Sequence, residues 1–147
     1  MHMSREQLCF EDVAVGDELP PLRTVFTTRH LAMFAGASTD FYELHYDRTF
    51  AERAGLDGVI VQGALKNALL GRLLQEWAAP GGRILSFGCS YRGMDLPGEE
   101  LECRGKVTAV SQDEQGRGVV DVEISVGKAD GTVTTPGRGR VTLPHRV

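Results

Sequence analysis

The sequence is poor in cysteine and has no long hydrophobic run, and these two absences narrow the possible classes of protein. Three of the 147 residues are cysteines, an odd number, and no two of them form a CxxC pair. Neither a disulfide framework nor a zinc knuckle is indicated, because each needs cysteines in matched pairs. No apolar stretch approaches the ~20 residues of a membrane-spanning helix, so we expect no membrane partner.

Excess positive charge is also absent. The chain carries 16 Lys and Arg against 20 Asp and Glu, which gives a net charge of −4. Without a basic run or patch, a nucleic acid partner is not expected. The first residues, Met1-His2-Met3-Ser4-Arg5, lead into polar residues instead of the apolar segment of a secretory signal. The sequence therefore predicts a cytoplasmic protein.

Motifs for metals, nucleotides and serine nucleophiles are missing as well. His30, His45 and the cysteines have no spacing typical of metal ligands. The glycines at 81–82 and 137–139 do not stand in the strand–GxGxxG–helix context of a dinucleotide site. The Gly-x-Ser-x-Gly motif of serine hydrolases does not occur. We predict no metal site and no cofactor.

What the chain does contain is enough apolar material for one core. Hydrophobic residues make up 41% of the sequence and charged residues 24%, which is typical of globular proteins. A chain of 147 residues has the length of one ordinary domain. We therefore expect residues 1–147 to form a single domain.

The strongest helical pattern lies between Gly63 and Ala78. Leucine or tryptophan recurs at every fourth position, 65, 69, 73 and 77, which places a wide apolar stripe along a helix. Pro80 and the two glycines that follow end the helix. Its polar side is predicted to hold Lys66, Arg72, Gln75 and Glu76. The breadth of the stripe predicts a helix largely surrounded by other structure.

Alternating apolar and polar residues predict strands both before and after this helix in the sequence. The four predicted strands after Gly82 cover residues 83–92, 101–110, 118–128 and 133–143. We expect them to follow one another as an antiparallel meander. Before the long helix, the pattern predicts a strand at 22–27, a helix at 29–35 that Gly36 stops, and a helix at 47–55 that Asp47 caps.

The predicted fold class is therefore α+β, with an antiparallel sheet of about five strands wrapped around one long helix. The exposed edges of such a sheet predict dimerisation.

One stretch, from Ser38 to Ala64, combines the residue types that proton transfer requires. Asp40 and His45 stand five residues apart, before an apolar run that ends at Gly63 and the long helix. A carboxylate and an imidazole can divide two proton transfers around one water, and a glycine N–H at a helix start can hold a carbonyl oxygen. Each residue alone has a simpler interpretation, as a turn residue or a surface imidazole. The spaced pair before a glycine-led helix favours chemistry.

This stretch resembles the signature of the MaoC-like (R)-specific enoyl-CoA hydratases and dehydratases, which have the hot dog fold. The positions that match the signature are Asp40, Leu44, His45, Asp47 and Gly63. The resemblance extends to residues 10–17 and 94–99, and so it covers nearly the whole chain.

Three positions depart from the family pattern. Tyr42-Glu43 replaces Asn-Pro, Gln62 replaces a histidine, and Thr39 stands where the family has a glycine. Both proton-transfer groups are nevertheless present, so the altered residues bear on the substrate more than on the reaction.

The resemblance implies a lyase of lipid and fatty acid metabolism, which hydrates trans-2-enoyl thioesters and dehydrates (R)-3-hydroxyacyl thioesters of CoA or acyl carrier protein. It implies that Asp40 activates a water, that His45 makes the complementary proton transfer, and that the Gly63 N–H holds the thioester oxygen. The residues expected to line the pocket are Phe41, Tyr42, Leu44 and Gln62.

Two other functions remain open on the same fold. A hot dog acyl-CoA thioesterase would use Asp40 to direct water at the carbonyl carbon and would not need His45. A subunit active only beside a second hot dog partner resembles the small hydratase subunits of actinobacterial fatty-acyl and steroid-CoA pathways. A homodimer or a heteromer with another hot dog subunit is expected in either case.

Overall fold

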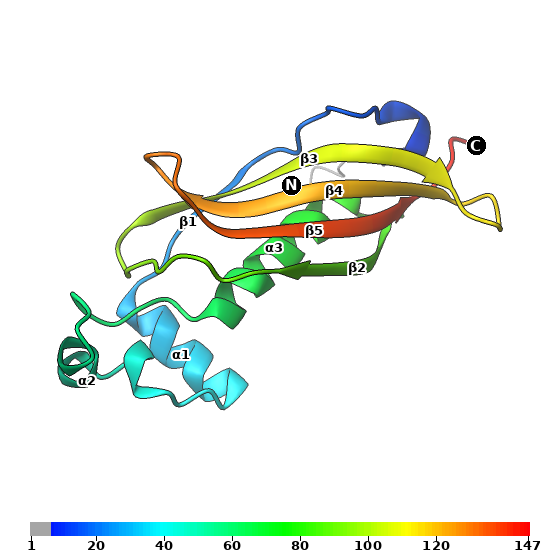
Figure 1. Cartoon of the computed structure of the whole chain (residues 1–147). Helices are drawn as coiled ribbons and strands as arrows, with labels where there is room; N and C mark the ends of the chain where they lie inside the picture. Colours follow the sequence, from blue (N-terminus) through cyan, green and yellow to red (C-terminus); the bar gives the residue numbers. More distant parts are fainter. Residues whose placement is uncertain (1–6) are drawn as a thin grey trace, which may run out of the picture.

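The computed structural model describes residues 7–147, and its centre is one antiparallel sheet (Figure 1). The sheet contains β1 (Leu22–Val25), β2 (Arg83–Cys89), β3 (Glu100–Gln112), β4 (Gly118–Lys128) and β5 (Val133–Leu143). Its strand order is β1-β3-β4-β5-β2, and every neighbouring pair is antiparallel. The predictions about residues 1–5 lie outside the described part of the chain.

The predicted meander is correct for β3, β4 and β5 but wrong for β2. Instead of pairing with β3, β2 pairs with β5 at the far edge of the sheet. The reason is the long connection over residues 90–99. It first follows β5, where Arg92 N and Gly93 N both donate to Thr134 O at 2.9 Å. It then reaches the residue after β1, where Gly98 N donates to Phe26 O at 2.7 Å. The connection thus crosses the end of the sheet before β3 begins.

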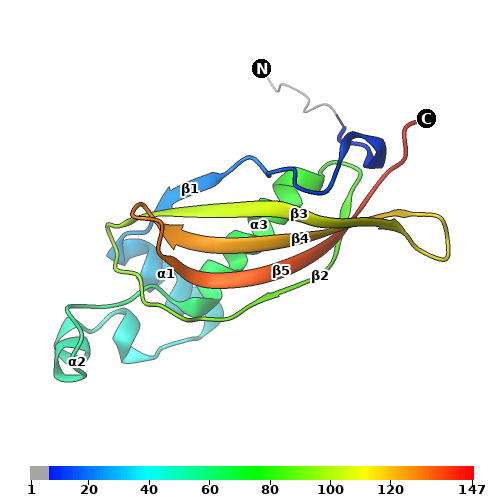
Figure 2. The ribbon, with the colours of Figure 1, turned by 45° about the horizontal axis from the view of Figure 1, so that its top comes forward.

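The long helix α3 (Gly63–Ala78) lies in the hollow of the curled sheet, as Figure 2 shows. Its buried apolar residues are Leu69, Leu70, Leu73, Leu74 and Ala78. A Cβ on Gly139 of β5 would lie 2.5 Å from a methyl carbon of Leu74, so only a glycine permits this close helix–sheet approach. The predicted α+β arrangement, a five-stranded antiparallel sheet around one long helix, is confirmed.

Lys66 was predicted on the polar side of this helix, and this prediction is wrong. Its residue surface is only 2% exposed. Positions 66, 70 and 73 lie on one face of a helix, so Lys66 belongs to the buried stripe. The ammonium group is tolerated there because the carboxylate of Asp95, at 2.7 Å, pairs with it.

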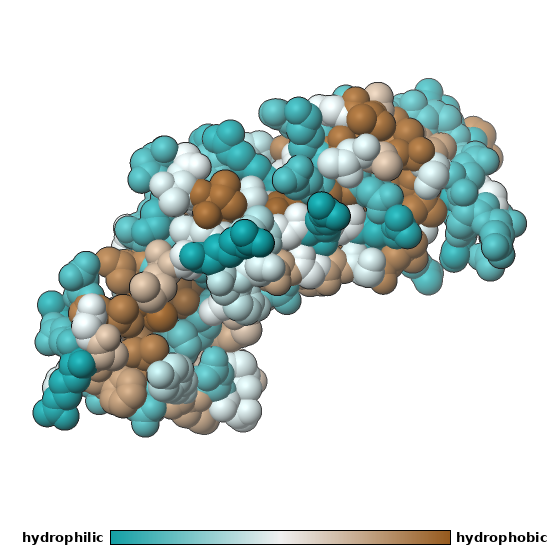
Figure 3. Space-filling view, in the orientation of Figure 1, coloured by the Kyte–Doolittle hydropathy of each residue, from teal (hydrophilic) through white to brown (hydrophobic). Residues whose placement is uncertain are grey.

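A small lobe projects from one end of the sheet (Figure 1) and carries exposed hydrophobic side chains (Figure 3). It contains α1 (Thr28–Ser38), the 3₁₀ turn η2 (Glu43–His45) and α2 (Arg48–Arg53). A further 3₁₀ turn, η1 (Phe10–Asp12), lies near the carboxyl end of the chain, where Phe10 N donates to Pro144 O at 2.9 Å. The prediction that Gly36 ends the first helix is wrong. The helix ends at Ser38, and its C-cap residue Thr39, with φ of 59°, takes the chain into the left-handed region.

The second lobe helix begins as predicted. Asp47 is its N-cap, and the carboxylate accepts a 3.0 Å hydrogen bond from Phe50 N. Gly55, with φ of 84°, follows the helix end. Among the helices described in residues 7–147, none has both the length and the apolar character that a membrane span needs.

Candidate active site

The three residues predicted to carry chemistry come from the lobe and from the start of α3. Asp40 follows α1, His45 ends η2, and Gly63 is the first residue of α3. Nε2 of His45 lies 3.8 Å from Oδ2 of Asp40. Their side chains differ in exposure, since that of His45 is 10% exposed and that of Asp40 is 41% exposed. The imidazole thus lies in the wall of the lobe, and the carboxylate reaches solvent.

The orientation of the His45 ring is fixed by the backbone of residue 60. Nδ1 of His45 lies 2.8 Å from the carbonyl oxygen of Ile60. A carbonyl oxygen can only accept, so Nδ1 carries the proton and donates it to Ile60. In the neutral imidazole, Nε2 then has a free lone pair, and this lone pair faces Asp40. The backbone therefore selects the tautomer in which His45 accepts a proton at Nε2.

The position of Asp40 depends on the turn that ends α1. Thr39 occupies the left-handed region, and the Asp40 N–H donates to Oγ of Ser38 at 3.3 Å. The carboxylate accepts from Tyr42 N at 3.4 Å through Oδ1, which leaves Oδ2 toward His45. Asp40 is thus both a turn residue and a free acceptor.

Gly63 brings the amino end of α3 to a pocket of about 280 Å³ next to His45. The N–H groups of a first helical turn have no acceptor within the helix, and the helix dipole makes them attractive to a partly negative oxygen. A Cβ on Gly63 would lie 2.9 Å from the ring of Tyr91. The pocket is lined by His45, Ile60, Val61, Gly63, Lys66, Tyr91, Arg92, Gly93 and Met94.

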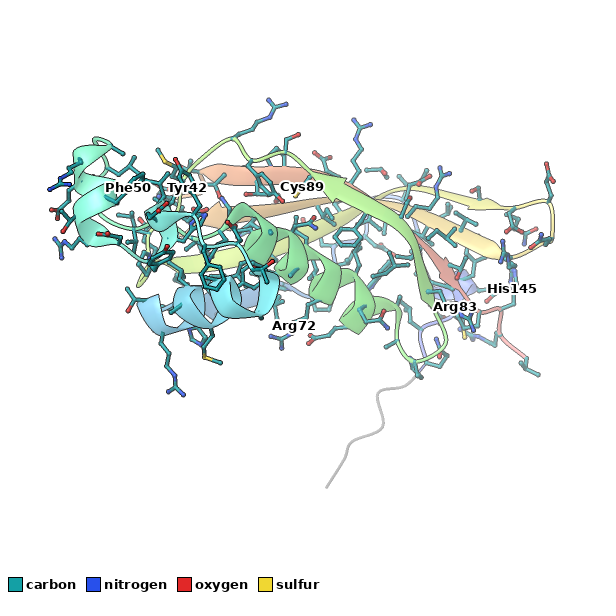
Figure 4. All side chains as sticks on the ribbon, turned by 90° about the horizontal axis from the view of Figure 1, so that it is seen from below. Tyr42, Phe50, Arg72, Arg83, Cys89 and His145 are labelled. Atoms are coloured by element: carbon teal, nitrogen blue, oxygen red, sulfur yellow. The ribbon has the colours of Figure 1, made fainter. Side chains whose placement is uncertain are left out.

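The four predicted pocket residues do not line this cavity. Phe41 and Tyr42 are exposed on the lobe, and Leu44 packs against the core. The ring of Tyr42 stands edge-on to the ring of His45, with 6.1 Å between the ring centroids. It also stands edge-on to the ring of Phe50, with 6.0 Å between the centroids; both Tyr42 and Phe50 are labelled in Figure 4. Tyr42 therefore supports the imidazole from the lobe.

Gln62 lies beneath the lobe and is fully buried. Its Nε2 donates to the carbonyl oxygen of Leu31 at 2.8 Å, which ties the start of α3 to α1. Its Oε1 has no partner among the described residues. This side chain joins two elements instead of facing the pocket.

Sequence reasoning missed the far wall of the pocket, which the connection between β2 and β3 provides. Tyr91, Arg92 and Met94 lie on this segment, and Asp95 follows them. The sequence pattern predicted a strand that continued to Arg92, whereas β2 ends at Cys89, and it gave no signal that the following segment crosses the sheet. A signal for Lys66 did exist, since its spacing from Leu70 and Leu73 is that of a buried face.

Comparison with known proteins agrees with this fold. Residues 14–130 match the model of the MaoC like domain. The (R)-specific enoyl-CoA hydratase of Aeromonas caviae is 28% identical over 120 residues, which are 81% of this chain and 87% of the relative. The solved structure of that (R)-hydratase has a TM-score of 0.82 and 27% identity, with coverage of 91% and 99%.

Two further relatives are larger or form part of an assembly. The β subunit of the 3-oxo-4,17-pregnadiene-20-carboxyl-CoA hydratase of Mycobacterium tuberculosis is 27% identical, over 90% of this chain and 89% of the relative. The fatty acid synthase β subunit TOXC of Cochliobolus carbonum is 41% identical over 73 residues, which are 48% of this chain but only 4% of that protein. The chain thus spans a small part of the fatty acid synthase relatives.

The model match covers most of the chain, and the sheet curled around α3 is the hot dog fold of the structural neighbours. The chain belongs to the MaoC-like domain family.

Proposed function

We propose that this chain is a hydro-lyase that interconverts trans-2-enoyl and (R)-3-hydroxyacyl thioesters. The observation that carries the proposal is the 3.8 Å separation between Asp40 Oδ2 and His45 Nε2, beside the pocket that Gly63 opens. This separation is too long for a direct hydrogen bond, but one water can lie ~2.8 Å from each of the two atoms and donate to both. Such a water donates one O–H to the carboxylate and the other to the imidazole.

The proposed hydration uses three groups of the chain. The oxygen of the held water adds to C3 of the enoyl thioester, and the proton that the water releases passes to the Asp40–His45 pair. The pair delivers a proton to C2, so that the elements of one water are added. Between these events the thioester oxygen gains negative charge, and the Gly63 N–H at the start of α3 stabilises it. Dehydration follows the same steps in reverse.

The relatives support this reaction class and two substrate carriers. The Aeromonas caviae relative is an (R)-specific enoyl-CoA hydratase, and another relative belongs to a fatty acid synthase. We therefore propose acyl-CoA or acyl carrier protein thioesters as substrates. The Mycobacterium tuberculosis relative is named as a β subunit, so we propose assembly as a homodimer or with a second hot dog subunit.

The experiment that tests the proposal follows crotonyl-CoA and longer enoyl-CoAs at the ultraviolet absorbance of the conjugated thioester. A fall in absorbance without free thiol is the expected result. Release of free thiol would replace the proposal with a thioesterase. Inactivity toward every substrate, repeated after addition of candidate hot dog partner subunits, would contradict hydration by this chain.

A further inference from the structure

A buried polar cluster lies directly behind the pocket and takes no part in the proposed proton transfers. Oδ2 of Asp95 accepts two hydrogen bonds, from Nζ of Lys66 at 2.7 Å and from Oγ1 of Thr134 at 2.8 Å. Nζ of Lys66 also donates to the carbonyl oxygen of Gly93 at 2.9 Å. The three side chains are at most 3% exposed and come from α3, the β2–β3 connection and β5.

This cluster reaches both halves of the candidate site through short links. The carbonyl oxygen of Asp95 accepts from Val61 N at 2.9 Å. The residue before Val61 is Ile60, whose carbonyl oxygen orients His45. The side chain of Lys66 lies one helical turn after Gly63 and lines the pocket. One residue, Asp95, therefore restrains the chain on both sides of Gly63.

Stability alone is a poor reason for these groups to occupy this place. Removing two charges from water costs free energy that their attraction only partly returns, and apolar residues of similar size often serve a core equally well. Oδ1 of Asp95 in addition has no partner among the described residues, which adds to the cost. The cluster does fix the geometry of the pocket, because each hydrogen bond sets the distance between two segments of the chain there.

We propose that Asp95, Lys66 and Thr134 are positioning residues that hold the Gly63 N–H and the His45 imidazole in register with each other. The proposal rests on the hydratase function proposed above. It assigns no contact with substrate to Asp95 or Thr134, which act through the backbone of residues 60–63. If the cluster is weakened, the Gly63 N–H and the His45 imidazole, which act together, move apart. The rate of the catalytic step should then fall more than the affinity for substrate.

Two adjacent threonines on β5 provide a matched pair for the test. Thr134 and Thr135 are both buried, but Oγ1 of Thr134 donates to Asp95 whereas Oγ1 of Thr135 has no partner among the described residues. Thr134→Val is expected to lower kcat by roughly tenfold with little change in KM. Thr134→Ser, which keeps the hydroxyl, restores kcat, and Thr135→Val leaves it unchanged. Equal effects of the two valine variants would overturn the proposal.

The charged pair gives a second test that separates folding from positioning. Lys66→Met alone leaves a buried carboxylate unpaired and is expected to lower the melting temperature. The double variant Lys66→Met/Asp95→Asn leaves no unpaired charge and is expected to regain much of the melting temperature. It should not regain kcat, because the link from Lys66 to Gly93 is lost. Recovery of kcat together with stability would reduce the cluster to a structural role.

A readout that needs no turnover distinguishes failure of this proposal from failure of the hydratase function. In ¹H–¹⁵N spectra, the Gly63 amide signal and the His45 ring signals should shift in Thr134→Val and stay in place in Thr135→Val. If the wild-type chain hydrates no enoyl thioester, the proposed function fails and these shifts still measure the positioning. If these signals do not move in Thr134→Val, the positioning proposal is overturned even where the wild-type chain is active.

Discussion

His45 donates from Nδ1 to the carbonyl oxygen of Ile60 at 2.8 Å, across fifteen residues of chain. This bond joins the lobe to the segment that leads into α3. Ile60 N in turn donates to Leu44 O at 3.0 Å, so the two segments hold each other at two points. The placement of the imidazole thus depends on how the lobe sits against α3, and not only on the spacing between Asp40 and His45.

The first prediction concerns the carboxylate. Asp40→Asn keeps the shape of the side chain and its acceptor for Tyr42 N, but removes the proton acceptor beside His45. We expect hydration to fall roughly 10²–10⁴-fold, the usual contribution of one acid–base group, with an unchanged melting temperature. The measurement is the loss of enoyl-CoA absorbance under saturating substrate.

Glu43 provides the matched control for this variant. It lies on η2 between the two proposed catalytic residues, and the same acid-to-amide change, Glu43→Gln, alters the local charge equally. We expect near wild-type turnover from it. If Asp40→Asn also retains wild-type turnover, Asp40 has no part in the mechanism.

The second prediction concerns the start of α3. In Gly63→Ala the new methyl lies 2.9 Å from the Tyr91 ring, which is 56% exposed and can turn toward solvent. We therefore expect a modest effect on stability but a fall of about 100-fold in kcat/KM, because the methyl obstructs the approach of the thioester oxygen to the N–H. Gly58→Ala is the control, since a Cβ at Gly58 meets nothing within 4 Å. Equal activity of the two variants would remove Gly63 from the oxyanion site.

Local patterns allowed much of this fold to be predicted, and long-range contacts account for what was missed. The apolar repeat of α3 and the cap at Asp47 depend on neighbours a few residues away, and both predictions are confirmed. The pairing of β2 with β5 depends on the path of residues 90–99, which no periodicity describes. The same path brings Asp95 to Lys66, so a lysine predicted at the surface lies in the core.

The candidate site divides in the same way. The residue types and spacing of Asp40 and His45 are visible in the sequence, but Nε2 faces Asp40 only because Ile60 holds Nδ1. The predicted walls were Gln62 and three sequence neighbours of His45, whereas the pocket is lined largely by Gly63, Lys66 and the distant segment around Tyr91. Side chains adjacent in sequence to His45 point to the lobe surface or core instead.

The third prediction concerns Thr39, which replaces a glycine of the family signature. With φ of 59°, its β-branched side chain is in a region that costs an L-residue about 1–2 kcal/mol. A glycine loses more backbone entropy on folding, which costs roughly 0.5–1 kcal/mol and offsets part of this gain. The free energy of unfolding of Thr39→Gly should therefore rise by about 0.5–1 kcal/mol. Denaturant unfolding measures the change. Thr39→Ala is the control, because it keeps the Cβ; a gain in alanine equal to that in glycine would contradict the φ argument.

The last prediction is a pH dependence at the carboxyl end of the chain. His145 lies 2.6 Å from Glu11 through Nδ1 and 2.9 Å from the carbonyl oxygen of Gly116 through Nε2. Both partners accept, so the ring must be protonated to donate to both. The hydrogen bond to Glu11, followed by that to Gly116, raises the pKa of His145 above 6.5. The same pair, with backbone hydrogen bonds, lowers the pKa of Glu11 from 4.5 to about 2.

The signs of these two shifts define a window. The contribution of His145 to folding stability is complete below its unfolded pKa of 6.5 and is lost as the pH rises through its raised folded pKa. The contribution of Glu11 is complete above 4.5 and is lost as the pH falls toward about 2. The coupling between Glu11→Gln and His145→Gln in a double-mutant cycle of melting temperatures should therefore be largest between about pH 4.5 and 6.5. It should shrink in alkali and in strong acid. A coupling that stays constant from acid to alkali would show that the ionised pair does not tether the carboxyl end.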